Sequence, residues 1–297
     1  DHPWSNATFD DNINQHRYPL TPIKNIVPDS ESDAKHARKI SQIKDAIVKG
    51  NLYQLNYGRT WKGKMSDHPW DSFSRMINNS PSPFGAWFYV HDHGWAVSSA
   101  SPERLIKTDG KIVNTRPIKG TRARGLDEET DLELKFELVS SEKELAEHLM
   151  LLDLGRNDVG KVSKVNSVKV TEKFKVERYS HVMHIVSNVI GKFNNKFSLF
   201  ETLLSGFPAG TVSGAPKIRA MEIIDELERN KRKLYAGGIG YFTPNGEFDT
   251  CIALRTALIK NNKFYVQAGA GIVADSKPEK EYAETINKAK ALMRAVD

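Results

Sequence analysis

Short strand-like segments recur along almost the whole chain, and only a few long helical patterns interrupt them. Runs bounded by turn residues predict strands at residues 52–61, 86–90, 95–99, 104–107, 112–115, 162–170, 184–190, 237–242, 251–259 and 264–268. Apolar residues at helical spacing predict helices at residues 33–49, 128–154, 216–227 and 277–295. Most strands follow one another without a helix between them. The pattern therefore predicts a single α+β domain of mostly antiparallel β-sheets packed with helices.

The domain is expected to cover residues 34–297. Residues 1–33 are rich in Pro, Asn, Asp and Ser without a clear period, which predicts an extended lead-in, the remnant of an N-terminal region. The longest apolar runs fall far short of a membrane span, so no membrane association is expected. A single cysteine, Cys251, excludes an internal disulfide and favours a reducing, cytoplasmic compartment.

The chain carries a net charge of +6, which can indicate nucleic acid, a membrane surface or an anionic metabolite. Its densest basic stretch, residues 161–178, alternates with Val and Phe and is typical of a strand with a solvated basic face. Recognised nucleic-acid modules are absent from the sequence, so no nucleic-acid partner is expected. An anionic metabolite is the favoured ligand class.

Two predicted helices each carry a pair of carboxylates at helical spacing. Glu144 and Glu147 share one helix face, Glu281 and Glu284 share another, and Lys288 lies four residues further along. Four carboxylates brought together suit a hard cation such as Mg²⁺, which prefers oxygen ligands. The spacing alone also fits glutamates that simply face solvent.

Two glycine-rich segments could offer backbone N–H groups to an anion. One spans residues 208–217 and ends where a helix is predicted to begin. The other spans residues 268–272 and follows a predicted strand. Each is equally compatible with a tight turn. A third segment, residues 115–125, sets Lys119 among Arg116, Arg122 and Arg124, and a lysine among cations can become a nucleophile if its pKa falls.

Seven longer motifs together resemble one known family. They are SASPERLI (99–106), RPIKGTRARG (116–125), AEHLMLLDLGRNDVG (146–160), HVMHIVSNV (181–189), PAGTVSGAPKIRAMEII (208–224), DTCIALRT (249–256) and QAGAGIVADSKPEKEYAET (267–285). The chain is similar to the chorismate-utilising enzymes, which include anthranilate synthase component I, aminodeoxychorismate synthase component I, and isochorismate and salicylate synthases. The resemblance runs from about residue 39 to residue 296 and implies the chorismate-binding enzyme fold.

The resemblance implies a site. The metal carboxylates fall on Glu147 and Glu284, supported by Glu144 and Glu281, with Mg²⁺ as the cofactor. Glu103 matches the general acid that helps the C4 hydroxyl of chorismate leave. The positions that match substrate contacts are Tyr235, Arg255, Gly269, Ala270, Gly271, Lys288, Thr211, His184 and Gln54.

The residue at one of these positions bears on the reaction. Isochorismate and salicylate synthases activate water with a lysine on an early strand, where this chain has Gln54. Glutamine is not a base, so amination is favoured over hydration. Ammonia is then a substrate. The sequence has no glutaminase motif with a nucleophilic cysteine, so a separate glutamine amidotransferase subunit is the expected source of nitrogen.

The two aminating subfamilies differ at the position of Lys119. Anthranilate synthases usually carry alanine there, and ammonia attacks C2 directly; aminodeoxychorismate synthases usually carry a lysine that attacks C2 first. Lys119 therefore favours 4-amino-4-deoxychorismate as the product, in the folate branch through 4-aminobenzoate. Several other motifs are closer to anthranilate synthase, whose product belongs to the tryptophan branch, and that enzyme is the alternative. A non-catalytic chorismate-binding relative is a more remote one.

Overall fold

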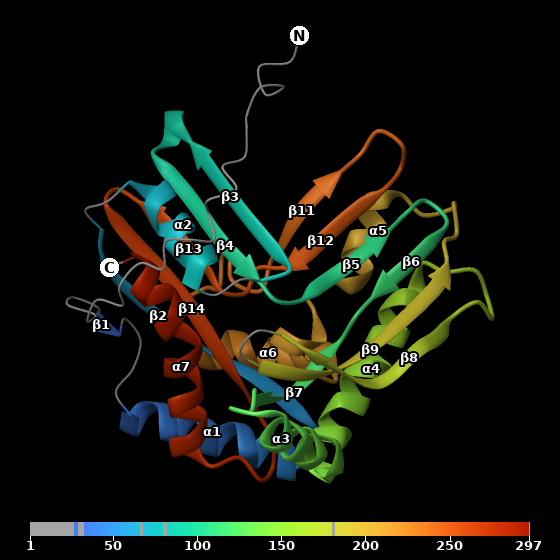
Figure 1. Ribbon diagram of the computed structural model, residues 1–297, viewed down its shortest axis with the longest axis horizontal. Coiled ribbons are helices and arrows are strands. Elements are labelled where there is room, and N and C mark those ends of the chain that lie inside the picture. The colour runs from blue at the N-terminus through green and yellow to red at the C-terminus, as the bar shows by residue number, and fades with distance from the viewer. Residues whose placement is uncertain (1–26, 29–32, 66–67, 80–81, 180–181, 297) are drawn as a thin grey trace.

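A computed structural model describes residues 27–28, 33–65, 68–79, 82–179 and 182–296. Two antiparallel β-sheets lie beside each other, with helices packed against them (Figure 1). Neighbouring strands are antiparallel throughout both sheets. This arrangement confirms the predicted α+β class. The expected lead-in lies outside the described residues, apart from residues 27–28 and the backbone of Asp33, and the domain boundary at residue 34 stays a prediction.

The first sheet has the strand order β1-β2-β14-β13-β4-β3, with β10 paired to β2. Its strands are β1 (Val27–Pro28), β2 (Gln54–Lys64), β3 (Phe84–Val90), β4 (Trp95–Ser101), β10 (Gly214–Ala215), β13 (Thr256–Lys260) and β14 (Lys263–Ile272). The long pairing of β2 with β14 sets Gly269 opposite Gly58 and Gly271 opposite Asn56. These two strands carry one wall of the site described below.

The second sheet has the strand order β11-β12-β5-β6-β9-β7, with β8 paired to β9. Its strands are β5 (Arg104–Thr108), β6 (Ile112–Thr115), β7 (Ile118–Ala123), β8 (Lys169–Arg178), β9 (Val182–Lys192), β11 (Gly238–Phe242) and β12 (Phe248–Ile252). Strand β7 lies at the end of this sheet and carries Lys119, opposite Ile185 of β9. It brings the lysine toward the helices that carry the glutamate pairs.

The helices form two groups around the sheets. They are α1 (Asp33–Val48), α2 (Pro69–Asn79), α3 (Glu128–Ser140), α4 (Glu142–Lys161), α5 (Leu199–Gly206), α6 (Lys217–Leu227) and α7 (Pro278–Val296), with short 3₁₀ turns η2 (His91–His93) and η3 (Gly210–Val212). Helix α7 packs on β14 and on α1 and α2, whereas α4 packs on β7 and β9 (Figure 1). None of the helices in the described part of the chain has the length and apolar character needed to cross a membrane.

Buried apolar side chains form a core on each sheet. In the first, Phe264 and Val266 of β14 pack with Leu292 of α7. In the second, Ile106 of β5 and Leu152 of α4 belong to a cluster that α5 and the η3 turn complete. Each helix thus buries its apolar stripe on one sheet, which fixes where its polar face points.

The chain passes between the two sheets at two points that matter for function. From β4 to β5 it crosses at residues 102–103, and from β12 to β13 it crosses at residues 253–255. The second crossing explains why the single strand predicted over residues 251–259 is two strands in different sheets. Arg255 has a left-handed backbone there, with φ of 46°. Glu103 and Arg255 therefore both lie at the seam between the sheets.

Two other expectations about local structure were wrong, and several elements were not predicted. The helix predicted over residues 128–154 is two helices, because the Ser141 hydroxyl accepts a hydrogen bond from the Glu144 N–H and starts α4. The strand predicted over residues 162–170 begins only at Lys169, since the chain first turns at the end of α4, where the Ser163 hydroxyl donates to the Val159 carbonyl. Helices α2 and α5 and strand β7 were not predicted, although Ser198 and Glu201 form a capping box at the start of α5.

Candidate active site

Glu103 is a buried acid at the seam of the two sheets, only 5% exposed. Its Oε1 atom accepts a 2.6 Å hydrogen bond from the hydroxyl of Thr211 in the η3 turn. Burial raises the pKa of Glu103 to about 7, against the opposing effects of Thr211, the Ile118 backbone, Lys119 and Lys288. A carboxyl group with that pKa is protonated often enough at neutral pH to serve as a general acid.

Asn56 of β2 connects the partner of this acid, Thr211, to Tyr235. Its Nδ2 donates to the Thr211 carbonyl at 3.3 Å, and its Oδ1 accepts from the Tyr235 hydroxyl at 3.4 Å. Burial raises the pKa of Tyr235 to about 12, so the phenol stays protonated as a donor. Sequence analysis did not single out Asn56, although it follows Gln54 at the two-residue period that sets both side chains on one face of β2.

Gly269 and Gly271 of β14 form a glycine floor directly beneath these side chains. A Cβ atom on Gly269 would lie 2.2 Å from Asn56 Oδ1 and 2.8 Å from the Tyr235 hydroxyl, and one on Gly271 would lie 2.6 Å from Gln54 Nε2. A larger residue at either position would displace side chains of β2 that lie across the strand. Ala270 differs from its neighbours, since its side chain packs in a core cluster and only its backbone is available to a ligand.

Arg255 supplies a positive charge at the second crossing between the sheets. Among the described residues, the Arg255 guanidinium group has no ion pair, and its one side-chain hydrogen bond is a long one of 3.5 Å to the Ser82 hydroxyl. Burial lowers its pKa, and its charge helps to lower the pKa of nearby His184. The His184 Nδ1 atom bonds the Thr121 hydroxyl at 2.9 Å. An arginine held without a carboxylate partner is suited to an anionic ligand.

The glutamate pair on α4 faces basic side chains. Glu147 Oε2 lies 2.6 Å from Lys119 Nζ, and its Oε1 lies 3.9 Å from Lys143 Nζ. Glu144 Oε1 lies 3.4 Å from an Arg122 guanidinium nitrogen. The two carboxylates therefore share a face of α4, as their spacing predicts, and each has a cation beside it.

The glutamate pair on α7 approaches the same region from the other sheet. Glu284 Oε1 lies 2.6 Å from Lys288 Nζ, which also donates to the Gly269 carbonyl at 3.0 Å. Burial opposes ionisation of Glu284, but Lys288 and Lys119 together hold its pKa below the usual value. Glu281 is 7% exposed, and burial and the charge of Glu284 raise its pKa. Since Lys119 acts on both α7 glutamates and on Glu147, the two pairs belong to one electrostatic cluster.

Lys119 stands at the centre of that cluster. Its burial opposes the positive charge, but Glu147, Glu284 and Glu144 outweigh the burial and raise its pKa. The side chain is therefore an ammonium ion. An ammonium has no lone pair to attack a carbon atom, whereas a nucleophilic lysine needs a lowered pKa. The arginines that were expected to lower it are engaged elsewhere: Arg116 pairs with Glu172 and Glu177, and Arg124 with Asp131.

The donor chemistry of the cluster fits a divalent cation that prefers oxygen. Two carboxylates from each of two helices belong to the cluster, and burial together with the charge of Glu284 raises the pKa of Glu281. In the described part of the chain, no three carboxylate, His or Cys side chains already stand at metal-binding distance. Lysine ammonium groups hold Glu147 and Glu284 instead.

Sequence analysis also missed His148, which supports this cluster from within α4. It is fully buried, and its Nε2 atom bonds the Ser187 hydroxyl at 2.7 Å, while Nδ1 lies 3.3 Å from the Lys119 carbonyl. Burial lowers its pKa to about 4, so the ring is neutral. His148 therefore joins α4, β7 and β9 behind the lysine. No sequence pattern separates this histidine from an ordinary buried one.

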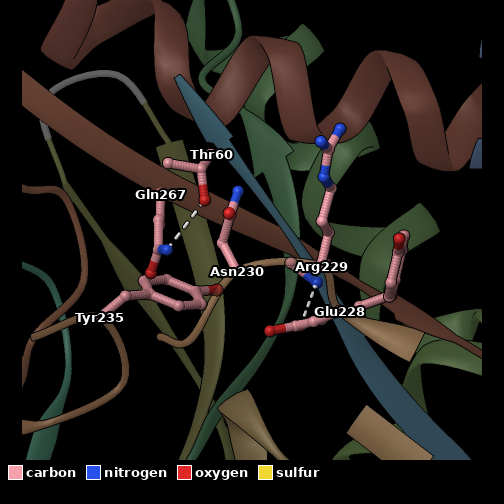
Figure 2. Close-up of a pocket in the computed structure, with 8 residues that line it drawn as sticks. Thr60, Glu228, Arg229, Asn230, Tyr235 and Gln267 are labelled. Carbon is pink, nitrogen blue, oxygen red and sulfur yellow. Dashed lines mark hydrogen bonds between the residues drawn. The ribbon is translucent and has the colours of Figure 1, made fainter. Parts of the chain in front are cut away.

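A small pocket lies behind Tyr235, next to the site (Figure 2). Figure 2 shows Gln267 and Thr60 joined by a hydrogen bond of 2.8 Å, and Glu228 beside the β2 backbone, where its Oε1 accepts from the Gly58 N–H at 2.7 Å. Arg232 donates to Glu228 at 2.6 Å and to the Asn56 carbonyl at 2.7 Å. These bonds tie the loop that carries Tyr235 to β2.

Comparison with known proteins gives a consistent result. The family profile described as chorismate binding enzyme matches residues 4–294. Anthranilate synthase component 1 of Cereibacter sphaeroides is 52% identical over 87% of this chain and 51% of its own length, and that of Pseudomonas aeruginosa is 46% identical over 98% of this chain and 61% of its own. The chain thus spans little more than half the length of these relatives.

Solved structures agree with the fold. The crystal structure of anthranilate synthase component I from Streptococcus pneumoniae matches with a TM-score of 0.84 and 41% identity, over 92% of this chain and 60% of that one. The structure of a putative 2,3-dihydroxybenzoate-specific isochorismate synthase from Bacillus anthracis matches with a TM-score of 0.80 at 24% identity, over 93% of this chain and 76% of that one. The latter likeness concerns the fold alone.

These relatives correct the main functional expectation from the sequence. Relatives at 45–52% identity are named anthranilate synthase component 1, so the expectation of an aminodeoxychorismate synthase with Lys119 as its nucleophile was wrong. The contacts of Lys119 supply the physical reason, since its ammonium group is paired with Glu147. The alternative product, anthranilate, is the better supported one.

Proposed function

Because the chain belongs to the chorismate binding enzyme family, we propose that it carries the catalytic site of an anthranilate synthase component I. The reaction converts chorismate and ammonia to anthranilate, pyruvate and water, in the tryptophan branch. The relatives of that name at 45–52% identity, which align with most of this chain, are the observation that carries the proposal. The cytoplasmic location expected from the sequence is part of it.

Chorismate is a dianion, and the site offers separate positive groups to its two carboxylates. Arg255 lies at the seam between the sheets, and Lys288 of α7 donates to the Gly269 carbonyl of β14. Charge-assisted hydrogen bonds from such groups are strong and directional. Tyr235, Thr211, His184 and Gln54 complete the proposed pocket.

Mg²⁺ is proposed to be held by Glu147 and Glu284, with Glu144 and Glu281 acting in part through water. When bound, a divalent cation there supplies positive charge to a substrate carboxylate and stabilises the charge that develops in the reaction. The convergence of four carboxylates on one cluster supports this assignment.

Glu103 is proposed to deliver the proton that the departing C4 hydroxyl needs. Hydroxide is a poor leaving group, and protonation converts it to water. The Thr211 hydroxyl fixes one carboxyl oxygen of Glu103, so the other is the one that carries the proton to substrate. With Lys119 protonated, ammonia rather than the lysine amine attacks C2, and elimination of pyruvate then gives the aromatic product.

The nitrogen is proposed to come from a separate glutamine amidotransferase subunit, or from free ammonia in its absence. The one cysteine of the sequence, Cys251, is buried in β12, and burial raises the pKa of its thiol. A protonated, inaccessible thiol is unsuited to attack glutamine. The chain's own residues therefore act on ammonia rather than release it.

A product assay tests the proposal. Purified protein, chorismate, Mg²⁺ and excess ammonium are incubated at mildly alkaline pH, and anthranilate fluorescence and pyruvate are followed together. Equal amounts of anthranilate and pyruvate are expected. A product that retains the pyruvyl ether, or no consumption of chorismate, would overturn it.

A further inference from the structure

Lys119 occupies a place that the proposed reaction does not explain. Its Nζ atom lies 2.6 Å from Glu147 Oε2, and the charges of Glu284 and Glu144 also act on it. Its side chain is 24% exposed and that of Glu147 is 11% exposed, so water screens the pair weakly. An ammonium ion thus sits on a carboxylate that is assigned to the metal.

Lys143 provides a useful contrast on the same carboxylate. Its Nζ atom lies 3.9 Å from Glu147 Oε1, and its side chain is 55% exposed. An exposed lysine at that distance is a weak partner, because solvent screens the charge and the long side chain moves freely. Of the two lysines beside Glu147, only Lys119 is held closely enough to compete with another cation.

The Gln54 side chain is the candidate for a second acceptor of Lys119. A Cβ atom placed on Gly271 would lie 3.5 Å from Lys119 Nζ and 2.6 Å from Gln54 Nε2, so the two side chains border the same point of β14. Gln54 is buried, and its Oε1 atom lacks a hydrogen-bond partner among the described residues. A buried carbonyl oxygen without a partner is costly, and a nearby ammonium group would satisfy it.

We propose that Lys119 is a resident counter-cation that moves between two acceptors. In the ligand-free chain its ammonium group neutralises Glu147. When a divalent cation binds there, the ammonium leaves Glu147 and donates to Gln54 Oε1. The proposal rests on the proposed function, because that function assigns Glu147 to Mg²⁺.

The charges give the direction of the effect. Two cations cannot share one carboxylate without repulsion, and within a few ångströms the repulsion is large even in a polar protein interior. Part of the metal's binding free energy is therefore spent on displacing Lys119. When metal is absent, the charge of Lys119 offsets the repulsion among the four carboxylates. As a consequence, the metal binds more weakly than it would without the lysine.

The test is calorimetric titration of the full chain with MgCl₂, without chorismate, so that the readout does not depend on turnover. Lys119→Met keeps the length of the side chain and removes its charge. It is expected to bind Mg²⁺ at least about tenfold more tightly than the unsubstituted chain. Lys143→Met is the matched control, with an expected change of less than about threefold. Circular dichroism checks the fold of each variant, and Lys119→Ala replaces Lys119→Met if that variant does not fold.

Gln54→Leu tests the second acceptor. Loss of the Oε1 atom leaves the displaced ammonium without a partner, so Mg²⁺ binding is expected to weaken about threefold to tenfold. The same substitution in a Lys119→Met background is expected to change nothing. Equal affinities for the unsubstituted chain and Lys119→Met, or equal gains from Lys119→Met and Lys143→Met, would overturn the proposal. So would a Gln54→Leu effect that persists without Lys119.

The outcomes separate this inference from the proposed function. Anthranilate formation by the unsubstituted chain, with no gain in Mg²⁺ affinity for Lys119→Met, rejects the role of Lys119 and leaves the function standing. A gain in affinity without anthranilate formation supports the counter-cation and rejects the function. Absence of Mg²⁺ binding in every variant overturns the counter-cation role, and the product assay then decides the function by itself.

Discussion

Glu103 is a buried carboxyl group and Glu147 a partly buried one; both belong to the proposed chorismate site, and they are held in opposite ways. Glu103 accepts a hydrogen bond from the neutral Thr211 hydroxyl, and burial raises its pKa to about 7. Glu147 lies 2.6 Å from the Lys119 ammonium group. One environment favours a carboxyl group that carries a proton, and the other favours a carboxylate that holds a cation.

The difference follows from where the chain sets each residue. Glu103 lies in the two-residue crossing from β4 to β5, where both sheets exclude water. Glu147 lies on the polar face of α4, at a spacing that brings Glu144 to the same face and opposite the α7 pair. The same residue type is thus suited to a proposed acid role in the seam and to a proposed metal-ligand role on the helices.

The largest effect is expected at the metal carboxylates. Glu284→Gln removes one charge and one ligand, so the rate of anthranilate formation is expected to fall at least about 10³-fold, with weaker Mg²⁺ binding. Initial rates over a range of MgCl₂ concentrations measure both quantities. Glu279→Gln, an exposed residue near the start of the same helix, is the control. Normal rates at ordinary Mg²⁺ concentrations would remove Glu284 from the metal site.

Glu103→Gln tests the other half of the comparison. The amide can still accept a hydrogen bond from Thr211 but cannot donate a proton to the leaving hydroxyl, so kcat is expected to fall about 10²-fold to 10⁴-fold. Calorimetry is expected to show unchanged Mg²⁺ binding. A variant that loses metal affinity along with activity would mean that the two regions do not have separate roles.

The pKa of Glu103 also predicts how stability depends on pH. Its folded pKa of about 7 lies above the ordinary value of 4.5, so the folded chain binds more protons between these pH values and loses stability as the pH rises through them. At pH 8 the Glu103→Gln variant is expected to be more stable than the unsubstituted chain, by on the order of 3 kcal/mol. Urea denaturation at pH 5 and pH 8 measures this. If Glu103→Gln raises the free energy of unfolding by the same amount at pH 5 and at pH 8, the raised pKa of Glu103 is contradicted.

The dependence of kcat/KM on pH is expected to show the ionisation of Glu103 as well. A general acid must be protonated, so kcat/KM is expected to fall as the pH rises above about 7. Thr211→Val removes a hydrogen bond that lowers the pKa of Glu103, and the fall is therefore expected at higher pH. If the fall in kcat/KM occurs at the same pH in Thr211→Val as in the unsubstituted chain, a group other than Glu103 causes that fall.

The smallest change in activity is expected from a substitution in the glycine floor of β14. A methyl group at position 271 would press on the end of the Gln54 side chain, which can move, so Gly271→Ala is expected to raise the KM for chorismate about tenfold while the chain still folds. Gly160→Ala on α4 meets only an ordinary contact at 3.9 Å and is the control. Steady-state kinetics on both variants measure the difference, and an unchanged KM would place the substrate away from β14.

Sequence alone gave the α+β class, most strands and both glutamate pairs, because these depend on local periodicity and motif. It did not predict that residues 251–259 divide between two sheets, since the left-handed Arg255 at the crossing depends on tertiary packing. It also missed the break at Ser141, although serine is a common N-cap.

The candidate site shows the same limit more clearly. Motifs identified Lys119, but its protonation depends on Glu147 and Glu284, which come from two distant helices. The resemblance to aminodeoxychorismate synthases, together with the neighbouring arginines in the sequence, led to the expectation of a nucleophilic lysine. In three dimensions the neighbours of Lys119 are carboxylates. Asn56 and His148 act through contacts with residues more than 28 positions away, which no local pattern reveals.

The position of the new nitrogen tests the central claim most directly. The chain is incubated with chorismate, Mg²⁺ and ¹⁵N-labelled ammonium, and the product is examined by NMR. The account predicts the label on the ring carbon next to the one that carries the carboxylate, as in anthranilate, since ammonia attacks C2 while Lys119 stays protonated. A label on the carbon opposite the carboxylate would contradict it.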